Sequence, residues 1–130
     1  MPQEQSKTPG YVEATNAVAA LTAAATVDLL ELQVADIAQL VVEIVVTTQA
    51  LDAFIMQGKT HPSSAYATLK AAWTVGGIVV DASGALNTQG AGTTGWAVVN
   101  VEGFHSIKFQ ASAAVDGANV TIRARGHGAA

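Results

Sequence analysis

An alternation of apolar and polar residues with a period of two dominates the last third of the chain. In residues 106–112 (SIKFQAS) and 119–125 (NVTIRAR) every second side chain is small or apolar, and residues 98–101 add a short apolar run. Successive side chains of a β-strand point to opposite faces, so this period predicts strands with one face on a core and the other in water. We expect three consecutive antiparallel strands, side by side in one sheet, over residues 94–125.

Turn residues separate these three runs. Gly103 follows the first run, and Asp116-Gly117 lies between the second and third. Glycine adopts positive φ without a Cβ clash, and Asp-Gly between alternating runs is a strong hairpin signal. The sequence therefore predicts a hairpin at residues 116–117.

Residues 26–55 fit two different structures. β-Branched residues are dense over residues 40–48 (LVVEIVVTT), which favours strands. We expect strands at residues 30–34, 40–47 and 51–57, with a turn at 48–50. The alternative is a coiled-coil helix, because several apolar residues follow steps of three and four. That seam would contain Leu30, Val34, Ile37, Val41, Ile44, Leu51 and Ile55.

Short strands separated by loops continue through the middle of the chain. We expect a loop at residues 58–64, strands at 65–72 and 78–81, and a glycine-rich connector at 83–95 with an edge strand near Leu86. Seven to nine short strands at near-regular spacing predict an all-β antiparallel β-sandwich, immunoglobulin-like or jelly-roll in type. The sandwich domain is expected over residues 26–126, followed by a tail at 127–130.

The first 25 residues differ from the rest and predict an extended N-terminal arm. Residues 1–10 are polar with two prolines, and residues 11–25 are rich in alanine. The alanines leave helix and extended chain open, since no apolar stripe forms. Tyr11 is exposed in a free arm and an anchor in an assembly. No basic segment precedes an apolar one at the start, so no signal peptide is expected.

The charge content is low and slightly acidic. Charged residues make up 12% of the chain, and the formal net charge is −4. Soluble domains usually carry about twice that fraction, so we expect part of the surface to be covered by sister subunits in a homo-oligomer. An acidic balance argues against a nucleic-acid partner. The most apolar window, residues 29–46, contains three acidic residues, which argues against a membrane span.

No residue pattern points to catalysis. The histidines (His61, His105 and His127) lie in separate segments, and none has a second ligand at metal-binding spacing. The glycines of residues 84–95 lack the Lys-Ser/Thr of a phosphate loop, and no serine has the context of an activated nucleophile. We expect no metal, no cofactor and no enzymatic activity.

The two tryptophans, Trp73 and Trp96, have two interpretations. Aromatic faces stack on sugar rings, but most tryptophans pack in or over a core. Because Trp96 follows a glycine loop and opens a strand, plugging the edge of the core is its ordinary role.

Four segments taken in order resemble small β-sandwich structural proteins of tailed-bacteriophage virions. They are VVEIVVTTQALDAF, GKTHPSSAYATL, TGWAVVNVEGFHSIKFQASAA and NVTIRARG, and they extend over residues 40–126. Such proteins occur among head decoration (cement), neck and tail components. The motifs are packing motifs, moderately specific, and similar ones occur in carbohydrate-binding sandwiches.

The resemblance implies a non-enzymatic virion protein, first of all a capsid decoration protein that stabilises the assembled head. Its partners would be the major capsid protein or other virion proteins, and it would be made in the host cytoplasm and located on the capsid surface. Neck or tail components and a glycan-binding module of a host-attachment apparatus are the alternatives. Partner contacts are expected at Tyr11 and Val12 of the arm and at Trp73 and Trp96.

Overall fold

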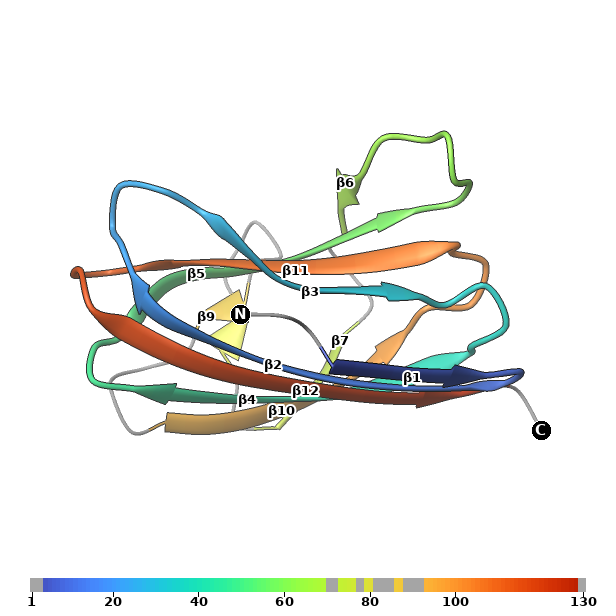
Figure 1. Ribbon diagram of the computed structural model, residues 1–130, viewed down its shortest axis with the longest axis horizontal. Helices are drawn as coiled ribbons and strands as arrows, with labels where there is room; N and C mark the ends of the chain where they lie inside the picture. The colour runs from blue at the N-terminus through green and yellow to red at the C-terminus, as the bar shows by residue number, and fades with distance from the viewer. Residues whose placement is uncertain (1–3, 70–72, 77–78, 81–85, 88–92, 129–130) are drawn as a thin grey trace.

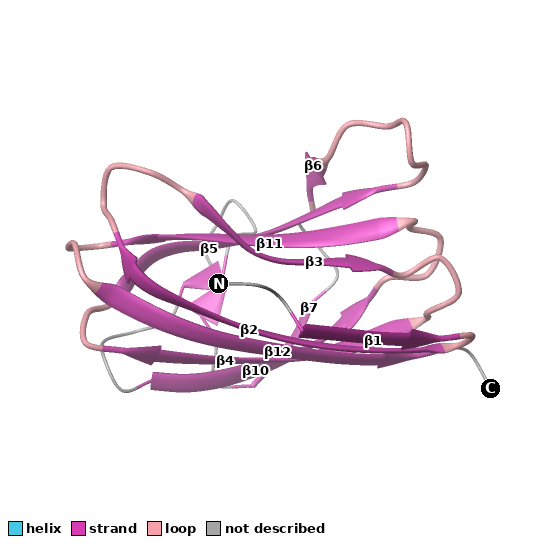
Figure 2. Cartoon of the chain, in the orientation of Figure 1, coloured by secondary structure: helices cyan, strands magenta, loops and turns pink. Residues whose placement is uncertain are grey.

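Two antiparallel β-sheets pack face to face (Figure 1). The computed structural model describes residues 4–69, 73–76, 79–80, 86–87 and 93–128. These residues form strands and loops (Figure 2), and no helix long and apolar enough to cross a bilayer occurs among them. The expected all-β sandwich is confirmed.

The first sheet is built from both ends of the chain and its middle. Its strand order is β1-β2-β12-β4-β10-β7, all antiparallel. The strands are β1 (Glu4–Thr8), β2 (Tyr11–Leu21), β12 (Ala118–His127), β4 (Gln39–Thr47), β10 (Thr93–Asn100) and β7 (Trp73–Gly76). The C-terminal strand β12 therefore lies inside the sheet, between β2 and β4.

The second sheet has the order β3-β11-β5-β9-β8, and β6 pairs with β5 beside this path. Its strands are β3 (Val27–Gln33), β11 (Ser106–Ala113), β5 (Leu51–Lys59), β9 (Leu86–Asn87), β8 (Val79–Val80) and β6 (Ala67–Thr68). A bulge between Phe109 and Gln110 shifts the register against β3. This extra residue explains why the consecutive Leu29 and Leu30 are both buried.

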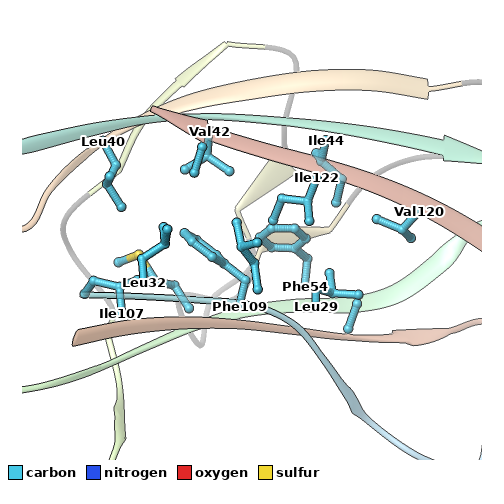
Figure 3. Close-up of a cluster of buried hydrophobic side chains, with 14 of the residues drawn as sticks. Leu29, Leu32, Leu40, Val42, Ile44, Phe54, Ile107, Phe109, Val120 and Ile122 are labelled. Atoms are coloured by element: carbon cyan, nitrogen blue, oxygen red, sulfur yellow. The ribbon is translucent and has the colours of Figure 1, made fainter. Parts of the chain in front are cut away.

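The core fills the space between the sheets with aliphatic side chains and two phenylalanines (Figure 3). Phe54 and Phe109 pack with ring centroids 5.8 Å apart and a tilt of 51°. Complete burial of such a side chain contributes about 1.5–3 kcal/mol. From the first sheet, Leu40, Val42, Ile44, Val120 and Ile122 face Leu29, Leu32, Ile107 and the two phenylalanines of the second.

The strand interpretation of residues 26–55 is confirmed, and the coiled-coil alternative is wrong. The row from Leu40 to Val46 is inward at every second residue, as a pleated strand requires. Thr48 has φ of 76° in the expected turn, and the Gln49 amide donates to the Thr47 carbonyl at 2.9 Å.

The expectation that residues 94–125 form three neighbouring strands of one sheet is wrong. The strands exist, and their alternation of buried and exposed residues is as expected, but β10 and β12 belong to the first sheet and β11 to the second. Alternation reports only that one face of a strand is buried, and both sheets of a sandwich bury one face. Asp116-Gly117 is a turn, with φ of 110° at Gly117, but it crosses between the sheets instead of closing a hairpin.

The expected N-terminal arm over residues 1–25 is not confirmed. Residues 4–21 form a β1–β2 hairpin, and β2 pairs with β12 along most of its length. Every second side chain of residues 11–16 points inward, so this segment is extended and contributes to the core. At the other end, His127 of the expected tail is the last residue of β12, and the Gly128 amide donates to the Gly10 carbonyl at 2.8 Å.

Several shorter elements agree in part with expectation. Residues 60–66 form the loop expected at 58–64, and β6 and β8 are short strands within the expected ranges 65–72 and 78–81. β9 matches the edge strand expected near Leu86, whereas Thr93–Gly95, expected in the connector, begin β10. The remaining parts of these expectations, at residues 70–72, 77–78, 81–85 and 88–92, lie outside the described residues.

Candidate interaction surface

Two cross-strand rows of side chains lie on the outer face of the first sheet, over β10, β4, β12 and β2. Their outward direction follows from strand parity, because the residues between them belong to the core. We call this surface the Trp96 face. Its first row is Trp96, Glu43, Arg123 and Thr15, and its second row is Val98, Val41, Arg125 and Glu13.

Large apolar side chains are exposed at one side of the Trp96 face. Trp96 is 48% exposed and Val41 is 45% exposed, and both lie on the outer face of strands that are paired on both sides. The half-buried Val98 lies directly opposite Val41 on the neighbouring strand. A cluster with an exposed tryptophan at a well-paired strand is typical of a surface that is covered in an assembly.

Two ion pairs lie beside this apolar cluster. Arg123 Nη1 is 2.8 Å from Glu43 Oε1, and Arg125 Nη2 is 3.5 Å from Glu13 Oε2. All four side chains are between about half and two-thirds exposed, so each pair alone adds little to stability. They line a shallow hollow of about 320 Å³ together with Thr15 and Val41. The ion pairs therefore shape the face and fix its pattern of charge.

Tyr11 extends the polar side of the Trp96 face. Its hydroxyl donates a hydrogen bond to Glu13 Oε2, and this bond raises the pKa of Tyr11 above its ordinary value. Tyr11 lies opposite His127 on β12. The hydrogen bond joins Tyr11 to the pair formed by Glu13 and Arg125.

The four residues expected as partner contacts have different surroundings. Trp96 is exposed on the surface, contrary to the ordinary expectation that it plugs the core edge. Tyr11 is partly buried at the rim of the same face. Val12 is completely buried in the chain's own core, so its side chain is not on the surface of the folded chain. Trp73 begins β7 and its backbone pairs with Val99, while its side chain lies outside the description.

A second, polar surface lies on the second sheet beneath the loop of residues 60–66. Tyr66 spans its outer face: its hydroxyl donates to Glu31 Oε2 at 2.5 Å, and its ring lies 4.8 Å from Lys59 Nζ and 4.5 Å from Lys108 Nζ. Burial, followed by the bond to Glu31, raises the pKa of Tyr66. These contacts hold the loop against the sheet, each cation–π contact adding about 0.5–1 kcal/mol.

A polar hollow of about 490 Å³ opens beside Tyr66. Among its lining residues, His105 Nδ1 and Ser106 Oγ are 2.6 Å apart, and Lys59 Nζ is 3.4 Å from the Pro62 carbonyl oxygen. No group of three or more His, Cys, Asp or Glu residues able to hold a metal ion occurs in the part of the chain that is described. The hollow is lined by Glu31, Leu32, Gln33, Lys59, Pro62, His105 and Ser106.

Sequence reasoning singles out Trp96 but misses Val41 and the two ion pairs. In the sequence analysis Val41 appears as part of the seam of the alternative helix. Val41 and Glu43 are two residues apart in β4, so their side chains point to the same face, and this spacing is the signal that could have shown that Val41 faces outward. Arg123 and Arg125 are exposed on the outer face of β12. Their acidic partners are not predictable, because they come from β4 and β2, which are far away in the sequence.

Comparisons with known proteins give information about the fold of this chain. No protein-family model matches the chain, and no curated protein matches it. Among solved structures, the crystal structure of the SPBc2 prophage-derived protein YomS is similar over 96% of this chain and 96% of its own, with a TM-score of 0.55 and 11% sequence identity. A protein of Bacillus endospore appendages, which form disulfide-linked pili, aligns over 95% of this chain and 93% of its own, with a TM-score of 0.42 and 11% identity. The likeness to YomS shows that the two chains share a fold.

Proposed function

We propose that this chain is a non-enzymatic structural protein of a tailed-phage virion that decorates the outside of the capsid. The Trp96 face is the surface through which each copy contacts its neighbour on the particle. The exposure of Trp96 and Val41 on central strands is the observation that carries this proposal. A folded chain that keeps these side chains in water gains free energy when an assembly covers them.

The proposed mechanism is cementing. A protein that binds a surface present only in the assembled shell stabilises that shell by mass action. Covering Trp96 and Val41 contributes hydrophobic free energy, and the ion pairs around them restrict which surfaces fit. Catalytic groups are not needed for this role.

Two further observations support a virion protein. The fold is shared with YomS, a prophage-derived protein, over nearly the whole of both chains. The chain is 12% charged, with a formal net charge of −4, which suits a surface that is partly covered and does not compete for DNA.

The first experiment tests where the protein is found. Purified phage heads and tails are analysed separately by quantitative mass spectrometry. A decoration protein is expected on heads in many copies per shell, and its removal should lower the temperature at which heads release DNA. Recovery with tails at a few copies per particle would support the neck or tail alternative, and absence from both fractions would contradict the proposal.

A pair of variants tests the surface. Trp96→Ser combined with Val41→Ser removes the exposed apolar side chains of the face, and at least a roughly tenfold loss of particle occupancy is expected, because a tryptophan that is covered in a contact often dominates its binding free energy. Val115→Ser is the matched control, since Val115 is 59% exposed at the turn between β11 and β12. Equal occupancy of the two variants would contradict a role for the Trp96 face.

A glycan-binding module is the second candidate, and the exposed ring of Trp96 favours it. The test is binding of the wild type and of Trp96→Ala to a glycan array. Binding by the wild type that is lost in Trp96→Ala, with an unchanged circular dichroism spectrum, would support glycan binding over capsid decoration.

A further inference from the structure

The charges of the Trp96 face are sorted by strand. Glu13 lies on β2, Arg123 and Arg125 lie on β12, and Glu43 lies on β4. The sign of the charge therefore changes between β2 and β12 and again between β12 and β4, and the second of these two lines lies near the middle of the face. A surface with basic residues along one side of a line and an acidic residue along the other is complementary to its own copy turned over about that line.

We infer that the Trp96 face pairs with the same face of a second copy of this chain. The two-fold axis lies in the interface, parallel to the strands and between β12 and β4. This inference deepens the proposed function by naming the occupant of the contact surface, and it rests on that function only in taking the face as a contact surface.

The half-turn matches opposite charges at the centre of the interface. Arg123 and Glu43 are directly paired in register, so the rotation brings Arg123 of each copy over Glu43 of the other. The existing ion pair of 2.8 Å then becomes half of a ring of four charges with alternating signs. The Coulomb attraction within such a ring is stronger than in an isolated exposed pair, because the partner sheet excludes water, and it offsets the cost of removing water from the four charges.

The same rotation covers the apolar side chains. Trp96 comes over Thr15 of the second copy, and Val41 comes over the aliphatic part of Arg125. Arginine stems pack on apolar surface while their charged ends stay hydrated. The rotation therefore places Val41 on an apolar stem and Trp96 on a small side chain, and at the outer strands it brings Glu13 over Val98.

The size of the face agrees with a reversible dimer. Its four strands contain 8 to 11 residues each. With about 4.8 Å between strands and about 3.3 Å per residue, the outer side of these four strands covers roughly 600 Å² per copy, and the two rows of the Trp96 face are only part of it. Specific interfaces bury about 600–1,000 Å² on each partner, so the contact needs the whole outer side of the four strands and lies at the lower end.

A partner of a single charge fits this face less well. A polyanion such as nucleic acid would be attracted by Arg123 and Arg125 but repelled by Glu13 and Glu43, which lie on the strands to either side. A strongly basic partner would be attracted by Glu13 and Glu43 but repelled by Arg123 and Arg125.

Charge reversal with complementation tests the inference. Arg123→Glu and Glu43→Arg are made separately in the full chain, and sedimentation equilibrium measures self-association. The wild-type chain is expected to dimerise, and each variant alone should have at least an approximately tenfold higher dissociation constant, because like charges now meet. An equimolar mixture should regain association, since the two acidic side chains of the Arg123→Glu copy then face the two basic side chains of the Glu43→Arg copy.

Controls separate a folding defect from a lost contact. Both side chains are about half exposed, so an unchanged circular dichroism spectrum is expected for each variant, with a melting temperature lowered somewhat because two like charges now lie opposite each other on neighbouring strands. Glu102→Arg is the matched control, because Glu102 is exposed in the loop after β10, and it should associate like the wild type. The mixing result is itself a folding control, since a misfolded variant is not rescued by another.

Three results would overturn the inference: a wild-type chain that stays monomeric at its solubility limit, single variants that associate normally, or a mixture that does not associate. Failure of the proposed function is recognised separately. A chain that shows charge complementation but is absent from purified virions contradicts the virion role and leaves the self-contact intact. A chain that is present on heads but shows no charge complementation supports the virion role and contradicts the self-contact.

Discussion

At the scale of single residues, Gly126 lies where β12 passes closest to the start of β4 and the loop before it. A Cβ atom at this position would lie 2.5 Å from Leu40 Cδ2, 2.8 Å from the Gln39 carbonyl oxygen and 2.8 Å from Ile37 Cγ2. The carbonyl belongs to the backbone and cannot move aside by a rotamer change. Glycine is required here by close packing between two central strands.

Gly126→Ala is therefore expected to destabilise the fold. Overpacking a well-filled core costs about 1–3 kcal/mol. Urea unfolding of the variant and the wild type measures this loss. Gly103→Ala is the control: Gly103 has φ of 90° with no heavy atom within 4 Å of the added Cβ, so it tests backbone strain without a clash. A Gly126→Ala variant as stable as the wild type would show that the strand can shift to make room.

The exposure of Trp96 shows a limit of sequence reasoning at this scale. Its opposite parity to Val99 is visible in the sequence, but which face of β10 meets the core depends on the strands beside it. Burial of a tryptophan side chain is favoured by its large apolar area, so the sequence alone favours burial of Trp96. The register pairs Trp96 with Glu43 on the neighbouring strand, and because paired residues lie on the same face, this pairing shows that Trp96 points outward.

At the scale of elements, Asp36 fastens the β1–β2 hairpin to the loop between β3 and β4. Lys7 Nζ donates to Asp36 Oδ1 at 2.7 Å, and the Gly10 amide donates to Oδ2 at 2.5 Å. These two bonds, with Lys7 first, lower the pKa of Asp36 below its ordinary value of 3.8. One carboxylate therefore fixes both the edge strand and the turn that follows it.

Asp36 predicts a pH dependence of hairpin stability. Because its folded-state pKa is lowered, its contribution is present above the unfolded value of 3.8 and is lost as pH falls through the folded value. Melting temperatures of the wild type and Asp36→Asn should differ at neutral pH and converge as the pH falls below 3.8 and through the lower folded-state pKa of Asp36. A constant difference across this range would mean that the charge of Asp36 does not carry the contact.

The sequence predicts where strands occur, but it does not predict which strands pair with one another. Residues 40–47 and 51–57 are expected as strands on β-branched content and alternation, and both are strands. Their assignment to different sheets depends on turns that cross the sandwich, and a Thr-Gln-Ala or Asp-Gly turn has no signal that separates crossing from returning. For the same reason the sequence wrongly predicts one sheet for three strands that share a hydrophobic period.

At the scale of the whole molecule, residues 4–21 belong to the sandwich. Val12, Ala14 and Leu21 are buried, and β2 pairs with β12 from Tyr11 to Leu21. Asn16 adds a link between the sheets, since its side-chain amide donates to the Leu29 carbonyl at 2.6 Å. Alanine-rich sequence has no strong strand preference and therefore favours the expectation of an arm, but tertiary packing decides the outcome.

Removing residues 1–25 is therefore expected to destroy the fold instead of releasing an arm. Deletion unpairs one side of β12 and uncovers the core. Deletion of residues 1–8 removes only the edge strand β1 and should leave a cooperative unfolding transition. Calorimetry of both truncations measures this, and a cooperative transition in the longer truncation would contradict an integral role for β2.

The position of β12 also has a consequence during synthesis. β2 and β4 are made early but are not neighbours in the sheet, because residues 118–127 separate them. Until this strand leaves the ribosome, two mostly apolar strands have open edges facing a gap that only β12 fills. The nascent chain therefore cannot complete its first sheet until residues 118–127 have been made, and until then the open edges of β2 and β4 can bind chaperones or aggregate.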